Sequence, residues 1–281
     1  SLLFVPVVSE RFVAKAHTRG ADAIILDLED SIAPGEKAAA RAALPSAAKT
    51  ITQAGTDVTV RINRPVELAV PDIAAAVCEE VKALMVPKVM GAEHVELLSE
   101  VVATQELVKG LPIGHTRFIA VVETAKALSN LVAIAQANPR VMALGLGSED
   151  LCTELDAQPG GDSLYPFSMQ VVAAARGAGI APFGAGGQFA DFSDPDGYRA
   201  GLRRSRGLGF SMTACIHPSQ VPIINEEYGV SEEAADRARR LIAAFEAALA
   251  GGSGAVAFEG AMIDLPVVER ARALLARAER G

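Results

Sequence analysis

The feature that most constrains the fold of this chain is a regular alternation of short apolar runs with longer, alanine-rich amphipathic stretches. Nearly continuous apolar and β-branched runs are typical of strands buried on both faces of a parallel sheet. The amphipathic stretches are typical of the helices that cover such a sheet. Eight runs occur, at residues 2–8, 23–28, 58–62, 83–88, 117–123, 141–147, 180–183 and 212–216. Helical patterns lie between them, among others at residues 34–54, 92–108, 124–137 and 163–177.

Eight strand–helix alternations within about 220 residues predict a closed (β/α)8 TIM barrel, an α/β fold that typically takes about 250 residues. The chain has 281 residues, and 50% of them are hydrophobic, so it can bury a large core. An open doubly wound sheet usually has fewer strands and a glycine-rich first turn, whereas residues 5–10 contain no glycine. We therefore predict a TIM barrel catalytic domain over residues 1–226.

The residues after the eighth run exceed what a barrel needs and predict a C-terminal helical extension over residues 227–281. Ser231, Glu232 and Glu233 are typical of a helix start, and this helix is expected to reach about residue 250. A flexible Gly-Gly-Ser-Gly break, a short extended piece at 255–258 and a last helix at 266–280 follow. We expect the extension to act as a lid, a packing arm or an oligomer contact.

Composition excludes several classes of function. The net charge is −8, and the chain has no basic patch of the kind that binds nucleic acid. Its three cysteines are an odd number without C-x-x-C spacing, which disfavours disulfides and zinc clusters and favours a reducing cytoplasm. No apolar run approaches the roughly 18 residues of a membrane-spanning helix. We expect a cytoplasmic protein with no nucleic-acid or membrane partner.

Charged residues gather at the ends of the second and third runs. A barrel enzyme works at the C-terminal ends of its strands, and Asp27, Glu29 and Asp30 end the second run. These acids either line the active site or form the N-terminal cap of the next helix. Arg61 ends the third run, where an unpaired charge among apolar neighbours is costly. It can grip a substrate carboxylate, pair internally with Asp27 or Glu29, or do both.

Two further acids indicate a metal site. Glu123 ends the fifth run and Asp150 follows the sixth, so adjacent strands each deliver one carboxylate to the barrel mouth. Such a pair can ligate Mg²⁺, with waters and substrate oxygens completing the octahedron, or serve as a general acid and base. The alternative is that Glu149 or Asp150 only caps a helix. Lys88, at the end of the fourth run, is a candidate electrostatic group or Schiff-base lysine. The alternative is a lysine at the rim that only extends its ammonium into solvent.

Two weaker candidates follow the last strands. Glycine-rich loops after the seventh strand of a barrel can cradle phosphate, and residues 184–187 read Gly-Ala-Gly-Gly. His217 follows the eighth run and either lines the site or caps the local turn.

Seven segments, taken in order, resemble one known family. They read SLLFVP from residue 1, DLED from 27, VRIN from 60, PKV from 87, VET from 122, GSEDL from 147 and IHPSQ from 216. The ordered set resembles the family of the citrate lyase beta subunit, malyl-CoA lyase and citramalyl-CoA lyase, within the HpcH/HpaI aldolase superfamily. The resemblance covers almost the whole chain.

This resemblance implies a Mg²⁺-dependent lyase, with Mn²⁺ as a possible substitute. Such an enzyme splits a 3-hydroxyacyl-CoA, such as citramalyl-CoA, malyl-CoA or citryl-CoA, into acetyl-CoA and a 2-oxo acid. By position, Glu123 and Asp150 resemble the metal ligands, and Arg61 resembles the group that holds the substrate carboxylate. Lys88 is a second candidate for binding the substrate. Glu29 and Asp30 resemble acids near the metal-bound water.

The tail resembles the family as well. Residues 258–266 are similar to a C-terminal motif in which an aspartate, here Asp264, reaches the active site of a neighbouring subunit, and the family forms homotrimers and homohexamers. Residues 183–186 and 211–215 depart from the family pattern, which leaves the acyl group and the dependence on CoA open. The alternatives are a class II aldolase that acts on free 4-hydroxy-2-oxo acids and a non-catalytic scaffold subunit.

Overall fold

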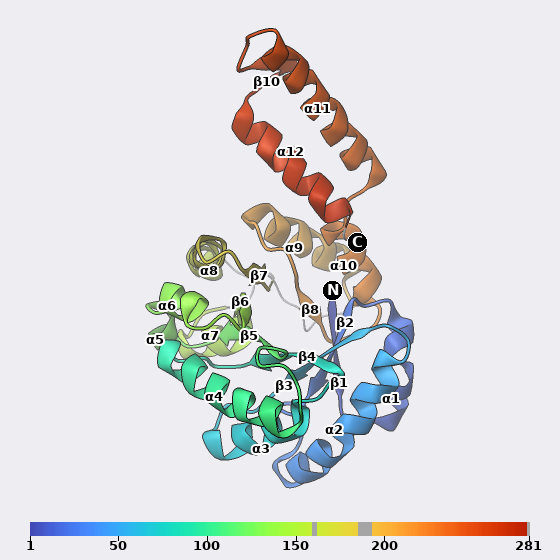
Figure 1. Ribbon diagram of the computed structural model, residues 1–281, viewed down its shortest axis with the longest axis vertical. Helices are drawn as coiled ribbons and strands as arrows, with labels where there is room; N and C mark the ends of the chain where they lie inside the picture. Colours follow the sequence, from blue (N-terminus) through green and yellow to red (C-terminus); the bar gives the residue numbers. More distant parts are fainter. Residues whose placement is uncertain (159–161, 185–192, 280–281) are drawn as a thin grey trace. The chain divides into compact units, whose positions relative to one another are not determined.

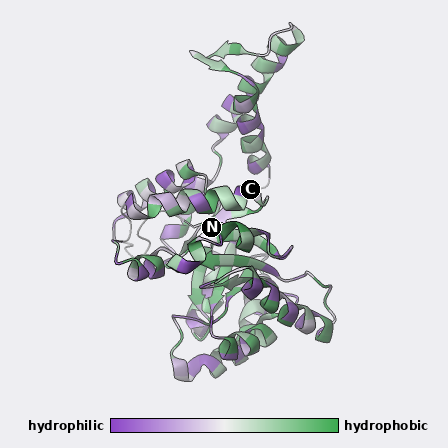
Figure 2. Cartoon of the chain, turned by 90° about the vertical axis from the view of Figure 1, so that its left-hand side faces the viewer, coloured by the Kyte–Doolittle hydropathy of each residue, from purple (hydrophilic) through white to green (hydrophobic). Residues whose placement is uncertain are grey.

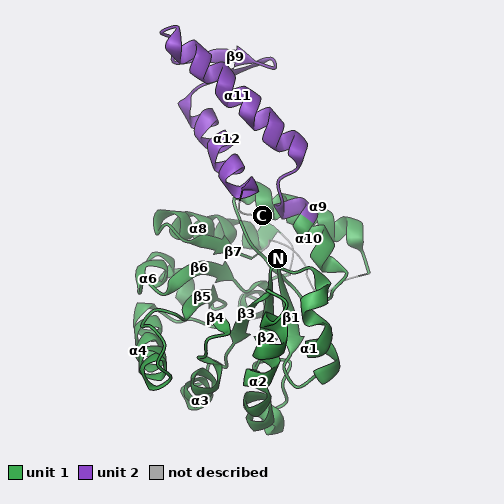
Figure 3. Ribbon diagram, turned by 45° about the vertical axis from the view of Figure 1, so that its right-hand side comes forward, with its two compact units in different colours: residues 1–225 green, residues 226–281 purple. Residues whose placement is uncertain are grey.

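The chain divides into two compact units (Figure 3). The computed structural model describes residues 1–158, 162–184 and 193–279. The first unit is Ser1–Asn225 and the second is Glu226–Gly281. Within the described residues, no helix is both long enough and apolar enough to cross a membrane.

The first unit is built on a parallel eight-stranded sheet with the order β7-β6-β5-β4-β3-β2-β1-β8 (Figure 1). Each of the eight predicted runs overlaps one strand. The bounds are β1 Leu2–Pro6, β2 Ala23–Asp27, β3 Asp57–Arg61, β4 Val81–Val86, β5 Arg117–Val122, β6 Val141–Leu146, β7 Ala181–Phe183 and β8 Ala214–Cys215.

The two end strands of this order meet and close the sheet. Phe183 at the end of β7 pairs in parallel with Met212, just before β8. The Gly184 amide donates to the Met212 carbonyl at 2.9 Å, and the Ser211 amide donates to the Pro182 carbonyl at 3.1 Å. The predicted (β/α)8 TIM barrel is therefore confirmed.

Helices connect successive strands and surround the sheet. They are α1 Glu10–Ala16, α2 Lys37–Thr52, α3 Val66–Ala76, α4 Ala92–Val108, α5 Ala125–Leu128, α6 Leu131–Gln136, α7 Ser148–Glu154, α8 Tyr165–Gly177, α9 Pro195–Leu208 and α10 Gln220–Tyr228. Short 3-10 turns occupy His17–Arg19, Pro34–Glu36 and Asp162–Leu164. Figure 2 shows predominantly hydrophobic strands, whereas the helices carry both hydrophilic and hydrophobic residues.

The prediction of a single helix over residues 124–137 is wrong, because the chain forms two helices there, α5 and α6. Asn130 leaves the helical conformation, with φ −110° and ψ 8°. Its side-chain amide donates to the main-chain oxygen of Met90 at 3.2 Å. This long-range contact interrupts a segment whose local pattern favours one continuous helix.

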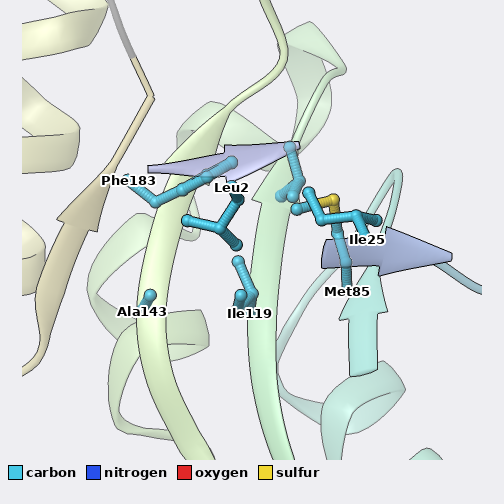
Figure 4. Close-up of a cluster of buried hydrophobic side chains, with 7 residues drawn as sticks. Leu2, Ile25, Met85, Ile119, Ala143 and Phe183 are labelled. Carbon is cyan, nitrogen blue, oxygen red and sulfur yellow. The ribbon is translucent and has the colours of Figure 1, made fainter. Parts of the chain in front are cut away.

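Side chains from six strands fill the barrel interior (Figure 4). The buried members are Leu2, Ile25, Met85, Ile119, Val121, Ala143 and Phe183. Small residues on β6 leave room for the largest of them. A Cβ added to Gly145 would lie 2.4 Å from the Phe183 ring. Because this interior is packed with side chains, polar groups can gather only beyond the strand ends.

A fully buried ion pair ties α4 to the loop before β6. Arg140 donates from Nη1 and Nη2 to the Glu106 carboxylate at 2.7 and 2.6 Å, and the exposed side-chain fractions are 5% and 0%. Glu106 also accepts from the main-chain amides of Gly114 and Thr116. Arg140 donates further to the Thr116 carbonyl. The pair therefore joins the strand-entry ends of β5 and β6.

Replacing Glu106 by glutamine is expected to lower the free energy of unfolding by about 3–5 kcal/mol, because Arg140 keeps a buried charge without its counter-ion. Urea denaturation measures the change. The double variant Glu106→Leu/Arg140→Met removes both charges and should recover most of the loss. A loss below about 1 kcal/mol in the single variant, the size expected of an exposed pair, would contradict this account.

The second unit consists of α11 Glu232–Ala250, β9 Val256–Phe258, β10 Ala261–Ile263 and α12 Leu265–Ala278. Ser231 caps α11 as predicted, since its side chain accepts from the Ala234 amide. The predicted extended piece is β9, and β10, which the pattern did not predict, pairs with it in antiparallel fashion. Ala238, Leu241, Phe245, Ile263, Val268 and Ala271 form a buried cluster inside this unit.

Candidate active site

A cavity of about 270 Å³ lies at the C-terminal ends of the barrel strands. Its wall combines acidic groups with apolar ones and includes Arg61 at the end of β3 and residues that follow β2, β4, β5, β6, β7 and β8. The lining residues are Phe4, Asp30, Arg61, Met85, Pro87, Val121, Glu123, Leu146, Gly147, Ser148, Glu149, Asp150, Phe183, Gly184, Thr213, Ala214, Cys215 and Ile216. Four of the candidate site residues from the sequence, Asp30, Arg61, Glu123 and Asp150, therefore share one cavity.

Arg61 is held by a buried carboxylate behind it. Its Nε and Nη2 donate to the two Asp27 oxygens at 2.7 and 2.8 Å, so the pairing is bidentate. The remaining Nη1 lies 3.0 Å from Glu29 and 3.4 Å from Asp30, and the guanidinium also lies over the Phe4 ring. The internal ion pair considered from the sequence is therefore present with both Asp27 and Glu29, and Arg61 still reaches the cavity.

Two residues that the sequence did not single out fix the main chain at Leu28 and Glu29. Lys37 donates to both of their carbonyl oxygens, at 2.7 and 2.6 Å. Asn63 donates to the Leu28 carbonyl at 2.8 Å and is itself held by the buried Asp72. These contacts set the direction in which the Glu29 side chain leaves β2. No local spacing in the sequence signals them.

Lys88 lies among three carboxylates. Its ammonium is 3.1 Å from Glu29 Oε1 and 3.5 Å from Asp150 Oδ2, and its main-chain amide donates to Glu123 Oε2 at 3.1 Å. Asp150 is in the first turn of α7 and makes no capping hydrogen bond there, so the capping alternative does not describe it. The structure therefore brings Lys88, Glu29, Glu123 and Asp150 together.

Glu123 is the most perturbed acid of this group. Burial raises its pKa to about 8, and the nearby charges of Glu29 and Asp150 act in the same direction. Gly147 makes the close packing possible, because a Cβ there would lie 2.4 Å from Glu123 Cγ and 2.5 Å from its Oε1. A buried carboxylate beside other carboxylates is stabilised by a cation.

Residues 1–218 match the HpcH/HpaI aldolase/citrate lyase family. The chain belongs to this family. Its relatives include the citrate lyase beta subunit of Leuconostoc mesenteroides subsp. cremoris, 33% identical over 98% of this chain and 91% of the relative. An L-malyl-CoA/beta-methylmalyl-CoA lyase of Cereibacter sphaeroides is also 33% identical, over 98% of this chain and 91% of its own length.

Solved structures of the HpcH/HpaI aldolase/citrate lyase family share the fold. The structure of CitE from Mycobacterium tuberculosis in complex with magnesium, acetoacetate and coenzyme A superposes with a TM-score of 0.78. It is 30% identical, and the match covers 99% of this chain and 97% of that one. The resemblance read from the ordered motifs is thereby confirmed, and the chain is a member of a family of carbon–carbon lyases.

The acidic cluster of this family member has the donor chemistry for a hard divalent cation. In the described part of the chain, no three His, Cys, Asp or Glu side chains form a complete metal site by themselves. Mg²⁺ often takes only one or two protein carboxylates and keeps waters. Glu29 Oε2 is buried and accepts no hydrogen bond of good geometry, although Arg61 Nη1 is 3.0 Å away. Oxygen donors, excess negative charge and an unsatisfied buried oxygen fit Mg²⁺ or Mn²⁺.

Replacing Gly147 by alanine is expected to weaken Mg²⁺ binding by at least about tenfold, because an added methyl displaces Glu123 and misplaced supporting groups typically cost 10- to 100-fold. Gly147 has φ −87°, so alanine causes no backbone strain there. Isothermal titration with Mg²⁺ measures the change. Gly201→Ala is the matched control, since nothing lies within 4 Å of its added Cβ. Equal affinities of both variants and the wild type would contradict the packing argument.

His217 and the glycine-rich segment 184–187, the two weaker candidates from the sequence, differ in their relation to the cavity. His217 is exposed and accepts from the Ser219 amide at 3.2 Å, which is a turn contact, and the cavity wall extends only to Ile216. Gly184 lines the cavity with φ 120°, a conformation that favours glycine. Residues 185–187 of the proposed phosphate loop lie outside the described residues.

Proposed function

We propose that this protein is a magnesium-dependent carbon–carbon lyase. It cleaves a 3-hydroxyacyl-CoA thioester into acetyl-CoA and a 2-oxo acid, and it joins the two in the reverse direction. The observation that carries the proposal is the convergence of Glu123, Asp150 and Arg61 on one cavity at the mouth of the barrel. Support comes from the M. tuberculosis relative, whose structure contains magnesium and coenzyme A, and from the malyl-CoA lyases.

Glu123 and Asp150 are the proposed ligands of Mg²⁺, with Mn²⁺ as a substitute. When bound, the cation supplies positive charge opposite the oxygens of the oxo-acid fragment. Glu123 and Asp150 leave ligand positions for water and substrate, as two carboxylates do in many Mg²⁺ sites. Glu29 lies between Arg61 and Lys88 and helps to orient this group.

Arg61 is the proposed partner of the substrate carboxylate. It is the only cationic side chain among the described residues that line the cavity. Asp27 fixes its plane through two hydrogen bonds, so Nη1 is presented in one orientation. A preorganised guanidinium binds a carboxylate with little further loss of entropy.

The proposed reaction requires one proton to leave oxygen and one to reach carbon. Asp30 lines the cavity and has an exposed side chain, so it is the proposed acceptor of the hydroxyl proton. The bond between C2 and C3 then breaks, C3 becomes the carbonyl carbon of the oxo acid, and the electron pair forms the thioester enolate. Asp264 is the proposed donor of a proton to C2, which gives acetyl-CoA.

The lining residues favour an oxo acid with one carboxylate. A second substrate carboxylate needs another cation or donor, whereas much of the wall is apolar, with Phe4, Met85, Val121 and Phe183. Glyoxylate and pyruvate meet this condition and oxaloacetate does not. The proposal therefore favours malyl-CoA or citramalyl-CoA over citryl-CoA.

A coupled assay tests the proposal. The protein is incubated with Mg²⁺ and malyl-CoA, citramalyl-CoA or citryl-CoA, and release of glyoxylate, pyruvate or oxaloacetate is measured. Turnover of a CoA ester is the expected result. Turnover of free 4-hydroxy-2-oxo acids alone would favour a class II aldolase. No turnover together with no Mg²⁺ binding would favour a scaffold subunit. We also propose a homotrimer or homohexamer, which light scattering measures directly.

A further inference from the structure

Lys88 has a backbone conformation that lysine rarely adopts. Its φ is 48°, and it is one of three residues other than glycine with positive φ in the described part of the chain. The left-handed region is unfavourable for a residue other than glycine, because its Cβ lies too close to the following carbonyl oxygen. Such outliers persist where the surrounding structure holds them, and they gather at functional sites. The positive φ of Lys88 therefore indicates that surrounding contacts hold this residue in an unfavourable conformation.

The left-handed turn directs two groups of one residue toward the same acidic cluster. The main-chain amide of Lys88 donates to Glu123, while its ammonium lies 3.1 Å from Glu29 and 3.5 Å from Asp150. These carboxylates come from the ends of β2 and β5 and from α7. One residue thus contacts acids from three separate parts of the barrel mouth.

The positive charge of the Lys88 ammonium is needed to balance the acidic cluster, because little other positive charge lies near these carboxylates. Asp27 already occupies two of the donor positions of Arg61. Burial opposes the charge on Lys88, but the hydrogen bond to Glu29 and the charges of Glu29, Glu123 and Asp30 outweigh it and raise the pKa of Lys88 above its usual range. The side chain is 29% exposed, so its flexible stem has room to move.

We propose that Lys88 is a positioning residue that acts as a tethered counter-ion. Its amide holds Glu123 in place, its ammonium holds Asp150 near Glu29 in the metal-free protein, and a divalent cation bound by Glu123 and Asp150 displaces the ammonium from Asp150. This inference rests on the proposed metal site. It differs from the simpler role of Lys88 as a substrate-binding group, which requires no competition between lysine and metal.

Metal binding and stability, measured without substrate, test the inference. In Lys88→Met, Mg²⁺ is expected to bind about tenfold more tightly, because no ammonium competes for Asp150. The metal-free variant should melt at a lower temperature than the wild type. Saturating Mg²⁺ should raise its melting temperature more than it raises that of the wild type, since ligand binding adds stability in proportion to RT ln(1 + [Mg²⁺]/Kd). Isothermal titration and thermal melts give both quantities.

Two further variants make the result specific. Lys88→Arg keeps a positive charge at this position. Its affinity for Mg²⁺ should therefore stay within about threefold of the wild-type affinity, whereas the loss of the competing charge in Lys88→Met changes it about tenfold. Lys109→Met is the matched control, because Lys109 also bonds two oxygens, but these are the main-chain carbonyls of Ala74 and Val77. It should change stability and leave the affinity for Mg²⁺ unaltered.

The outcomes separate this inference from the proposed function. Unchanged or weaker Mg²⁺ binding in Lys88→Met, with normal binding in the wild type, overturns the inference and leaves the metal site standing. If Lys88→Met does not fold in the absence of Mg²⁺, Lys88→Arg decides, since a wild-type affinity there supports the counter-ion role and a tenfold change overturns it. No Mg²⁺ binding by the wild type overturns both proposals.

Discussion

Glu123→Gln is expected to weaken Mg²⁺ binding by more than about 10²-fold, because loss of a group that only supports a ligand already costs 10- to 100-fold. Lyase turnover should fall by about 10³-fold, since charge stabilisation by a metal is worth several kcal/mol. The amide keeps the shape of the side chain and its contact with Gly147. Asp150→Asn should have the same direction of effect. Isothermal titration and the coupled assay measure the two changes.

The pH dependence of Mg²⁺ affinity provides an internal control for this variant. Glu123 has a pKa of about 8, so below that pH a proton must leave before the carboxylate can bind a cation. Wild-type affinity should therefore rise from pH 6 toward pH 8, by up to about tenfold per unit. Glu123→Gln has no such proton, so this rise should disappear. Full wild-type activity in EDTA would contradict the metal role altogether.

The fold was largely predictable because each strand can be recognised from its own residues, although the strands pair with segments far away in the chain. Each buried parallel strand is an apolar run, and the order of the runs along the chain is the order of strands around the barrel. Interruptions that depend on tertiary contacts were not predictable. Asn130 breaks a helical pattern through its bond to Met90. Strand β10 has only three residues and exists through its pairing with β9, so its pattern is too short to recognise.

The candidate site was predictable to the extent that strand ends converge. That rule places Arg61, Glu123 and Asp150 at one mouth, as the cavity shows. Asp27 and Glu29 were both predicted as internal partners of Arg61, but the division of the contacts between them was not predictable, because the two acids lie two residues apart and face the same side. The contacts of Lys37 and the close approach of Gly147 to Glu123 depend on loop paths and on side-chain packing. Neither leaves a spacing that a sequence can reveal.

Asp264→Ala is expected to keep the fold and the affinity for Mg²⁺ while slowing carbon–carbon chemistry by about 10²-fold or more, the usual size for a lost general acid or base. Asp264 immediately precedes α12, and its side chain is exposed and makes no capping hydrogen bond. Its carboxylate is therefore not required by the helix that it begins. Single-turnover rates with a CoA ester measure the chemical step, and isothermal titration checks that Mg²⁺ still binds.

Mixing two inactive variants decides which chain Asp264 serves. Glu123→Gln lacks a metal ligand and Asp264→Ala lacks the proposed proton donor. If Asp264 acts on a neighbouring subunit, subunit exchange creates some sites with an intact Glu123 from one chain and an intact Asp264 from the other, and activity returns. If Asp264 acts within its own chain, every site keeps one defect and the mixture stays inactive. The exposed Met262 and Leu265 beside Asp264 give this segment an apolar surface for such a contact. We therefore expect recovery, and a mixture that stays inactive despite demonstrated exchange would contradict action between subunits.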